Sequence, residues 1–410
     1  MRKILLATTA VVATAVFGVA EASAQQAPTV RVGGYFRFNY AFTDQDYNTV
    51  NAAGVTQPRP ANLGKSDFTA DSEIHVIVEG KTANGLSYGA TIELQVDQNR
   101  QATSGVSTKT SVDTDEMYMW ISSPTAGQLR FGDEDGVVLG AFANGFMTNF
   151  GTGGVDGDWL DNVVGANFRP GYIAGGYLTD STKIIYTSPS FFGFDFGASF
   201  AFNDAEGEDS GCDVLGTNCD RADSYAFTAT TVPRRKNEVQ GAVRYRGSFA
   251  GVGIAATAGY IGSDSTKNTV GDSGQGLSVG VFGLQATAYG LTVGGNYAFG
   301  NANSGLALLR KGQVDERDLE HVFLGASYTM GAITVGTNFS NSTSAGSQTS
   351  PAGLREQIWS VGGNYFLAPG LALVAEYTSG SRREGGVNLG NGVGAKVEAD
   401  VFILGTRIAF

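Results

Sequence analysis

The sequence predicts an all-β protein that folds as one up-and-down antiparallel barrel of sixteen strands. Its 410 residues include 59 glycines and 9 prolines, and each glycine inside a helix would cost about 1 kcal/mol, so a helical bundle is disfavoured. Apolar and polar residues alternate with a period of two along the chain. The connections between these runs are alternately short and long, which places all the turns at one end of the strands and all the loops at the other.

Composition excludes several other classes of protein. Hydrophobic residues make up 42% of the chain and charged residues 16%, a balance that disordered proteins do not have. Glycine does not recur at every third position, so a collagen helix is excluded. The formal net charge of -12 argues against a nucleic-acid partner, because phosphate binding requires a basic surface.

The N-terminal segment has the pattern of a secretory signal peptide. Arg2 and Lys3 precede an apolar run, and Ala22-Ser23-Ala24 has the small residues that signal peptidase recognises. We expect residues 1–24 to be the signal, with cleavage between Ala24 and Gln25, and residues 25–410 to form a single domain. A membrane anchor is the alternative, which the short apolar run disfavours.

The first strand illustrates the alternation. Between Val30 and Phe42 the even positions are mostly aromatic or aliphatic, whereas the odd positions include Arg31, Arg37 and Asn39. Further along, Asn84-Gly85 forms a hairpin turn signal between two alternating runs. The same reading along the chain predicts strands over 30–42, 67–80, 85–97, 114–122, 127–133, 182–188, 192–203, 237–246, 251–261, 275–287, 290–300, 319–330, 332–341, 356–367, 370–379 and 398–410.

The two faces of these strands predict a membrane barrel with a wet interior. One face is almost wholly apolar, while the opposite face carries ionisable residues at mid-strand: Arg37, Glu73, Glu93, Arg244 and Glu376. A closed barrel of sixteen strands has a diameter of roughly 30–35 Å, too wide for side chains to fill. The charged face therefore lines water and the apolar face meets lipid, with aromatic residues at the strand ends as interfacial girdles. Aromatic residues in the core of an ordinary sandwich are the alternative.

Cys212 and Cys219 are the only cysteines and lie in one polar stretch. An exported protein with two close cysteines is expected to pair them in a disulfide. A metal site is the weaker alternative, because neither His75 nor His321 is near them in the sequence.

Several stretches resemble a known family. They include RVGGYFRFNYAF at 31–42, EMYMWISSPTAGQLRFGD at 116–133 and VFILGTRIAF at 401–410. In this order they are similar to the general porins of the bacterial outer membrane, most like the α-proteobacterial trimeric type. The resemblance implies an outer-membrane, water-filled channel for passive diffusion of small hydrophilic solutes and ions. It also implies a homotrimer in contact with lipid and lipopolysaccharide, and recognition of Phe410 by the outer-membrane assembly machinery.

The resemblance further implies that the third long loop, Asp133 to Ser181, folds into the barrel as a constriction. Its acidic residues would face basic residues of the lumen wall, namely Arg37, Arg130 and Arg244. The alternative is a solvated surface loop. The acidic residues are Asp133, Glu134, Asp135, Asp156, Asp158 and Asp161.

Charge predicts the ion preference. Removing Arg2, Lys3 and Glu21 with the signal takes the net charge from -12 to -13, which favours cations weakly. No cofactor is expected, although GGVDGD at 153–158 has the look of a calcium turn.

An enzyme is not expected, because the sequence has two separated histidines and no phosphate-binding glycine motif. The alternatives to a general porin are a barrel-anchored adhesion or surface protein and a substrate-specific channel.

Overall fold

A computed structural model provides the fold. It describes residues 26–50, 56–59, 64–95, 112–163, 168, 181–204, 224–225, 234–268, 274–309, 318–345, 353–384 and 395–410. Both cysteines, the signal segment and Gln25 lie outside the described residues, so the predicted disulfide and cleavage site remain predictions.

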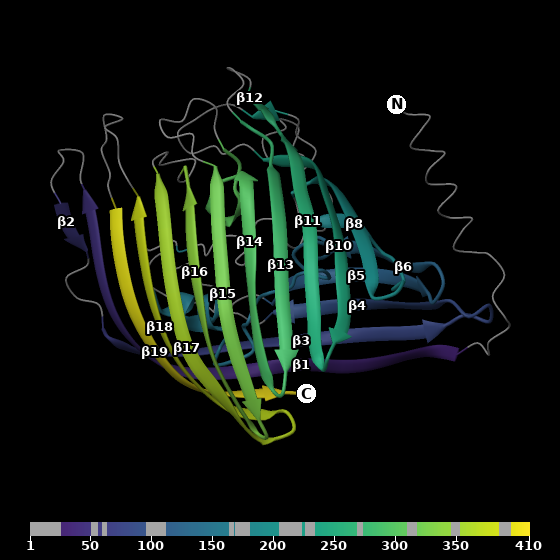
Figure 1. The fold of residues 1–410 in the computed structure, drawn as a ribbon, viewed down its shortest axis with the longest axis horizontal. Coiled ribbons are helices and arrows are strands. Elements are labelled where there is room, and N and C mark those ends of the chain that lie inside the picture. The colour runs from purple at the N-terminus through teal and green to yellow at the C-terminus, as the bar shows by residue number, and fades with distance from the viewer. Residues whose placement is uncertain are drawn as a thin grey trace.

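The chain forms a closed barrel of sixteen antiparallel strands (Figure 1). Each long strand pairs with the next along the chain, and β1 also pairs with β19, which closes the sheet. In this seam Arg37 is opposite Arg407 and Phe42 is opposite Phe402. Closure leaves no unpaired edge, as a sheet that crosses a bilayer requires.

The sixteen barrel strands are β1 (Gln26–Val50), β3 (Ser66–Lys81), β4 (Ser87–Gln95), β5 (Asp113–Ser123), β6 (Gly127–Asp133), β7 (Thr182–Thr187), β8 (Phe194–Asn203), β10 (Arg235–Phe249), β11 (Val252–Ser265), β13 (Ser278–Ala288), β14 (Leu291–Asn301), β15 (Leu319–Met330), β16 (Ile333–Ser344), β17 (Leu354–Ala368), β18 (Leu371–Glu384) and β19 (Ala395–Ala409). The short strands β2 (Thr56–Arg59), β9 (Ser224–Tyr225) and β12 (Lys267–Asn268) and the 3-10 turns η1 (Gly154–Asp156), η2 (Asp158–Asn162) and η3 (Ser304–Leu306) lie in the connections.

The short turns at one end of the barrel depend on left-handed backbone. At Ala250-Gly251 and Tyr289-Gly290 both residues have positive φ, between 50° and 82°. Two such residues in succession form the type I′ turn, whose twist matches that of the paired strands. The predicted Asn84-Gly85 turn is confirmed, with Gly85 at φ 86° and a hydrogen bond of 3.0 Å from its N–H to the Thr82 carbonyl.

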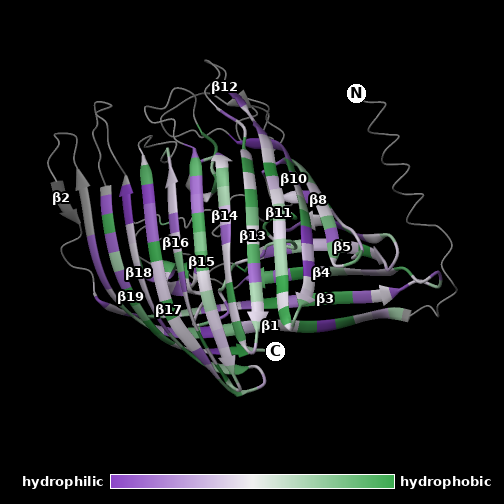
Figure 2. Cartoon of the chain, in the orientation of Figure 1, coloured by the Kyte–Doolittle hydropathy of each residue, from purple (hydrophilic) through white to green (hydrophobic). Residues whose placement is uncertain are grey.

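The outer surface of the barrel is apolar. Phe36 and Phe38 on β1 and Phe194 and Phe196 on β8 are all exposed, and the residues between them face inward. Figure 2 shows the resulting alternation of hydrophobic and hydrophilic residues along the strands. Among the described residues, no helix has the length and apolar character needed to cross a membrane.

The structure differs from the prediction in two ways. Several strands continue further toward the long loops; β1, for example, reaches Val50 and there pairs with β2. In addition, part of the inner face is apolar and dry. Ile261, Phe323, Ile358 and Ile403 point inward and are at most 1% exposed, because they lie in apolar clusters with residues of the third loop and, at Ile261, also of the connection between β14 and β15.

Candidate functional site: a loop bound to the inner wall of the barrel

The described residues of the third loop, 134–163, 168 and 181, run inside the barrel and follow the wall. Wall side chains bind the loop backbone at successive positions along this path. Ser199 on β8 accepts from the Val137 N–H at 3.2 Å, and Gln240 on β10 accepts from the Val138 N–H at 3.0 Å. Further along, the amide of Asn338 on β16 donates to the Met147 carbonyl at 2.9 Å. The described part of the loop therefore lies in the lumen, as the sequence predicted.

Inward-facing glycines make room for this loop. A Cβ placed on Gly325 of β15 would lie 2.7 Å from Cβ of Met147, and one on Gly380 of β18 would lie 2.9 Å from the indole of Trp159. At Gly336 of β16 a Cβ would overlap the ring of Phe150. Real Cβ atoms do not approach so closely, so only glycine lets the loop lie flat on the wall.

Apolar side chains of the loop pack into the space above these glycines. Phe150, Val155 and Trp159 are fully buried, and the Trp159 indole N–H donates to the Val155 carbonyl at 2.9 Å. Trp159 also packs edge to face on Phe168, with ring centroids 5.1 Å apart. Burying an aromatic side chain of this size contributes about 3–5 kcal/mol, judged by the cost of truncating one to alanine.

Glu376 on β18 is the strongest polar anchor of the loop. Its carboxylate accepts hydrogen bonds from the N–H groups of Thr152 and Gly154, both at 2.8 Å, and from the Thr152 hydroxyl at 2.9 Å. The segment 153–158, which suggested a calcium turn, places the Gly154 N–H toward the barrel wall. Hydrogen bonds to a charged group are worth about 1.5–3 kcal/mol each.

Asp158 forms a second anchor on the opposite side of the closing seam. Its two oxygens accept from Arg37 Nη1 and from Asn39 Nδ2 of β1, each at 2.7 Å. Arg37 also lies 3.6 Å from Asp71 on β3. The structure thus brings Asp158 and Arg37 into direct contact rather than across an open gap.

The acidic residues at the start of the loop are also engaged with the wall. The carboxylate of Glu134 forms an ion pair with Arg130 of β6. The backbone carbonyl of Glu134 accepts a hydrogen bond from Lys183 of β7. Asp133 accepts from the Thr182 hydroxyl at 2.5 Å. Burial raises the pKa of Glu134 above its usual value, although Arg130 opposes this shift.

Arg244 on β10 pairs with a residue of the wall rather than with a loop carboxylate. Its Nε and Nη2 donate to the two oxygens of Asp195 on β8 at 3.0 and 2.7 Å. Its remaining nitrogen donates to the Ala141 carbonyl at 2.5 Å, and the guanidinium lies over the ring of Phe142. Arg244 therefore positions the loop through its backbone. The sequence offered no signal for Asp195, which looked like one polar residue in an aromatic strand.

Asp156 and Asp161 are the loop acids that remain exposed. Protein surrounds Asp156 closely, and this partial loss of water, together with the charge of Asp135, raises the pKa of its carboxyl above the usual value. Lumen water still reaches the group. Burial likewise raises the pKa of Asp135.

The other predicted wall residues, Glu73 and Glu93, lie together with His75 on β3 and β4. His321 is fully buried on β15, far along the sheet from this cluster. Phe410 lies at the seam, where its N–H donates to the Gly34 carbonyl at 3.1 Å.

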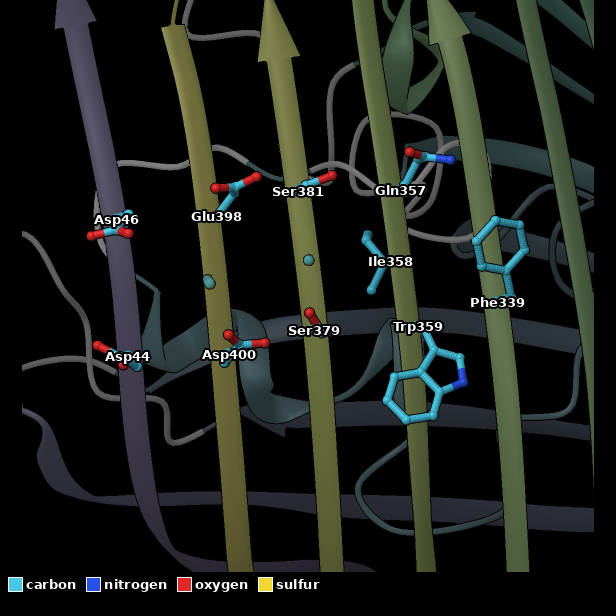
Figure 3. A pocket seen from close by; sticks show the side chains of 12 residues that line it. Asp44, Asp46, Phe339, Gln357, Ile358, Trp359, Ser379, Ser381, Glu398 and Asp400 are labelled. Carbon is cyan, nitrogen blue, oxygen red and sulfur yellow. The ribbon is translucent and has the colours of Figure 1, made fainter.

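A separate hollow lies on the outer surface near the loop end of the barrel. Figure 3 shows Asp44 and Asp46 of β1 beside Asp400 and Glu398 of β19, with Trp359 of β17 to their right. These carboxylates are cross-strand neighbours, since Asp44 pairs with Asp400 and Asp46 with Glu398. The polar rim marks where the apolar outer surface ends.

A closed barrel with an apolar outer surface, a charged interior and a loop along its inner wall defines a membrane channel. The family model for Gram-negative porins matches residues 7–385 of the chain. The chain therefore belongs to the Gram-negative porin family, whose members are outer-membrane channels.

Solved porins have the same fold. An engineered variant of the Rh. blastica porin aligns with a TM-score of 0.52 at 16% identity, covering 93% of this chain and 100% of that one. OmpT of Vibrio cholerae, in its trimer form, aligns with a TM-score of 0.57 at 14% identity, covering 94% and 100%. An anion-selective porin from Comamonas acidovorans aligns with a TM-score of 0.53 at 15% identity, covering 94% and 100%. A search of curated proteins finds no match.

Proposed function

We propose that the protein is a general diffusion porin that passes small hydrophilic solutes and ions and weakly prefers cations. The observation that carries the proposal is the third loop, which lies along the wall of a closed, charged barrel and narrows its interior. Charged groups along a narrow wet path favour polar solutes over apolar ones. Outer-membrane lipid and lipopolysaccharide would contact the apolar surface and its rim.

We assign the cation preference to the exposed loop acids. Asp133, Glu134 and Asp158 contact hydroxyl or guanidinium groups of the wall, whereas the side chains of Asp156 and Asp161 are exposed. The formal net charge of the chain, -12, is also negative and therefore also favours cations. The porin from Comamonas acidovorans has the same fold and is anion-selective. The sign of the selectivity therefore depends on the charges along the channel and not on the fold.

Reversal potentials in planar bilayers test the cation preference. The double variant Asp156→Asn and Asp161→Asn should lower the cation-to-anion permeability ratio by about two- to fivefold, since a charge 4–8 Å from an ion in water contributes roughly 0.5–1 kcal/mol. Because the pKa of Asp156 is raised, the ratio of the unmodified protein should also fall as the pH is lowered from 7 to 5. Asp46→Asn on the outer surface is the control and should change neither. An unchanged reversal potential in the double variant would remove the assignment.

The same recordings test the channel and its assembly. We propose a homotrimer, by analogy with the trimer form of the Vibrio cholerae neighbour, and expect each insertion to close in three equal steps. A correctly folded barrel that carries no current would instead support an anchor for a surface protein. A current that saturates with one solute would support a substrate-specific channel.

Export and assembly are proposed from the sequence and the family. We expect the outer-membrane protein to begin at Gln25, which N-terminal sequencing checks. Phe410→Ala should lower the amount of protein recovered in the outer membrane severalfold and leave precursor in the periplasm. Phe402→Ala is the matched control, because Phe402 lies on β19, which ends at Ala409 next to Phe410, and is also exposed at the outer surface. Equal recovery of both variants would contradict a special role for Phe410.

A further inference from the structure

Three side chains with metal-binding atoms lie together on the lumen wall. Glu73 and His75 lie two residues apart on β3, and His75 is directly opposite Glu93 on β4. Residues with this relation project from the same face of a sheet as near neighbours. Their ligand atoms lie within 4.8 Å of one another. The backbone pairing of two strands therefore fixes the cluster.

The imidazole of His75 lies between the two carboxylates. His75 Nε2 lies 2.5 Å from Glu73 Oε1, and His75 Nδ1 lies 3.7 Å from Glu93 Oε1, so each carboxylate is near a different ring nitrogen. Ligand atoms around one tetrahedral zinc ion are about 3.3 Å apart, since each lies about 2.0–2.2 Å from the metal. Only one ring nitrogen of His75 can bind the ion, so the imidazole and the carboxylates have to rotate to close around it; one ligand atom from each residue already lies within 4.8 Å of the other two.

Tyr35 holds the carboxylate of Glu73 in place. Tyr35 on β1, which is opposite Glu73, donates its hydroxyl proton to Glu73 Oε2 at 3.0 Å. Glu73 thus keeps its other oxygen for the cluster. Partners of this kind orient metal ligands in many proteins, and their loss typically lowers metal affinity 10- to 100-fold.

Charge at the cluster also favours a cation. Within the described part of the chain, neither Glu73 nor Glu93 forms an ion pair with an arginine or a lysine. The side chains of His75 and Glu93 are 28% and 16% exposed, so ions in the lumen reach them.

We propose that Glu73, His75 and Glu93 form a binding site for a divalent transition-metal cation such as zinc on the lumen wall. The imidazole distinguishes this site from one for calcium or magnesium, which prefer oxygen ligands only. This inference goes beyond the proposed function, because it concerns a ligand and not the passage of solutes. A bound metal ion neutralises negative charge near the start of the third loop, so it should also weaken any cation preference of the channel.

Calorimetric titration of zinc into the detergent-solubilised, folded full-length protein tests the proposal without any current being measured. The unmodified protein should bind one zinc ion per chain saturably, and magnesium at the same concentrations should give no signal at this site. His75→Ala and Glu93→Gln should each lower the zinc affinity at least tenfold, and Tyr35→Phe about tenfold. Glu79→Gln should leave the affinity unchanged, since Glu79 lies on the same strand but is half exposed and faces Arg31.

Two further observations keep the test decisive. Resistance to unfolding in detergent, seen as a heat-dependent shift in gel migration, confirms that each variant is a folded barrel. X-ray absorption at the zinc edge should give one imidazole nitrogen together with oxygen ligands. No saturable binding by the unmodified protein, or equal binding by folded His75→Ala, would overturn the site.

Discussion

Replacing Gly336 with leucine should narrow the channel and destabilise the barrel. Gly336 faces the lumen from β16, and even a Cβ there would overlap the ring of Phe150. The wall is a closed hydrogen-bonded sheet, so the loop has to move toward the lumen axis. Overpacking of this kind costs about 1–3 kcal/mol. We therefore expect a lower single-channel conductance and a free energy of unfolding that is lower by this amount.

Gly241→Leu is the matched control for Gly336→Leu. Gly241 faces outward on β10, and the nearest atom to a Cβ there is the Gly197 carbonyl oxygen at 4.0 Å. A leucine at this position meets lipid, so conductance and stability should stay near those of the unmodified protein. If Gly336→Leu conducts like Gly241→Leu, the loop does not rest on Gly336 in the membrane.

The barrel was predictable because its signals are local. Period-two alternation in β1 and the Asn84-Gly85 turn each depend on neighbouring residues, and the sixteen predicted strands all occur. Strand ends were less predictable. Past Phe42 the outward positions of β1 become Asp44 and Asp46, so the apolar pattern stops while strand pairing continues.

The docking of the loop was only partly predictable. A loop inside the barrel was expected, but its contacts join residues far apart in the chain, such as Val155 with Asn338, and no local pattern encodes them. Two signals in the sequence did point to a covered inner wall. Val401 and Ile403 make the inward face of β19 apolar, and Gly325 and Gly336 fall on inward positions where a wet lumen requires no glycine. Both features are explained by the loop packed against them.

The ion-pair partners of the lumen residues were harder to predict than which charged residues face the lumen. Arg37, Arg130 and Arg244 all lie on the inner face, but their partners are set by side-chain reach in three dimensions. Arg244 reaches Asp195 on the adjacent strand, where the two residues are directly opposite. Cross-strand register of this kind can be found only after the strands have been aligned with one another.

Removing the carboxylate of Glu376 should release the loop from the wall. The change Glu376→Ala leaves the N–H groups of Thr152 and Gly154 without their acceptor, and each unsatisfied buried donor costs about 1–3 kcal/mol. Because the rest of the barrel is intact, the loss falls mainly on loop docking. We expect noisy, fluctuating currents and rapid chymotrypsin cleavage after Phe150 or Trp159, both of which are fully buried when the loop is docked.

Glu376→Gln should give an intermediate result, since the amide keeps one acceptor oxygen but presents its NH₂ group to the remaining donors. Glu320→Ala is the control: Glu320 lies on β15 at the outer surface, where it accepts from the Tyr297 hydroxyl. Combining Glu376→Ala with Gly336→Leu should cost less than the sum of the two changes, because both act on the same docked loop. Full additivity, or protection of Phe150 and Trp159 in Glu376→Ala equal to that in Glu320→Ala, would show that Glu376 does not hold the loop. The graded order of glutamate, glutamine and alanine then separates loss of the negative charge from loss of the acceptor itself.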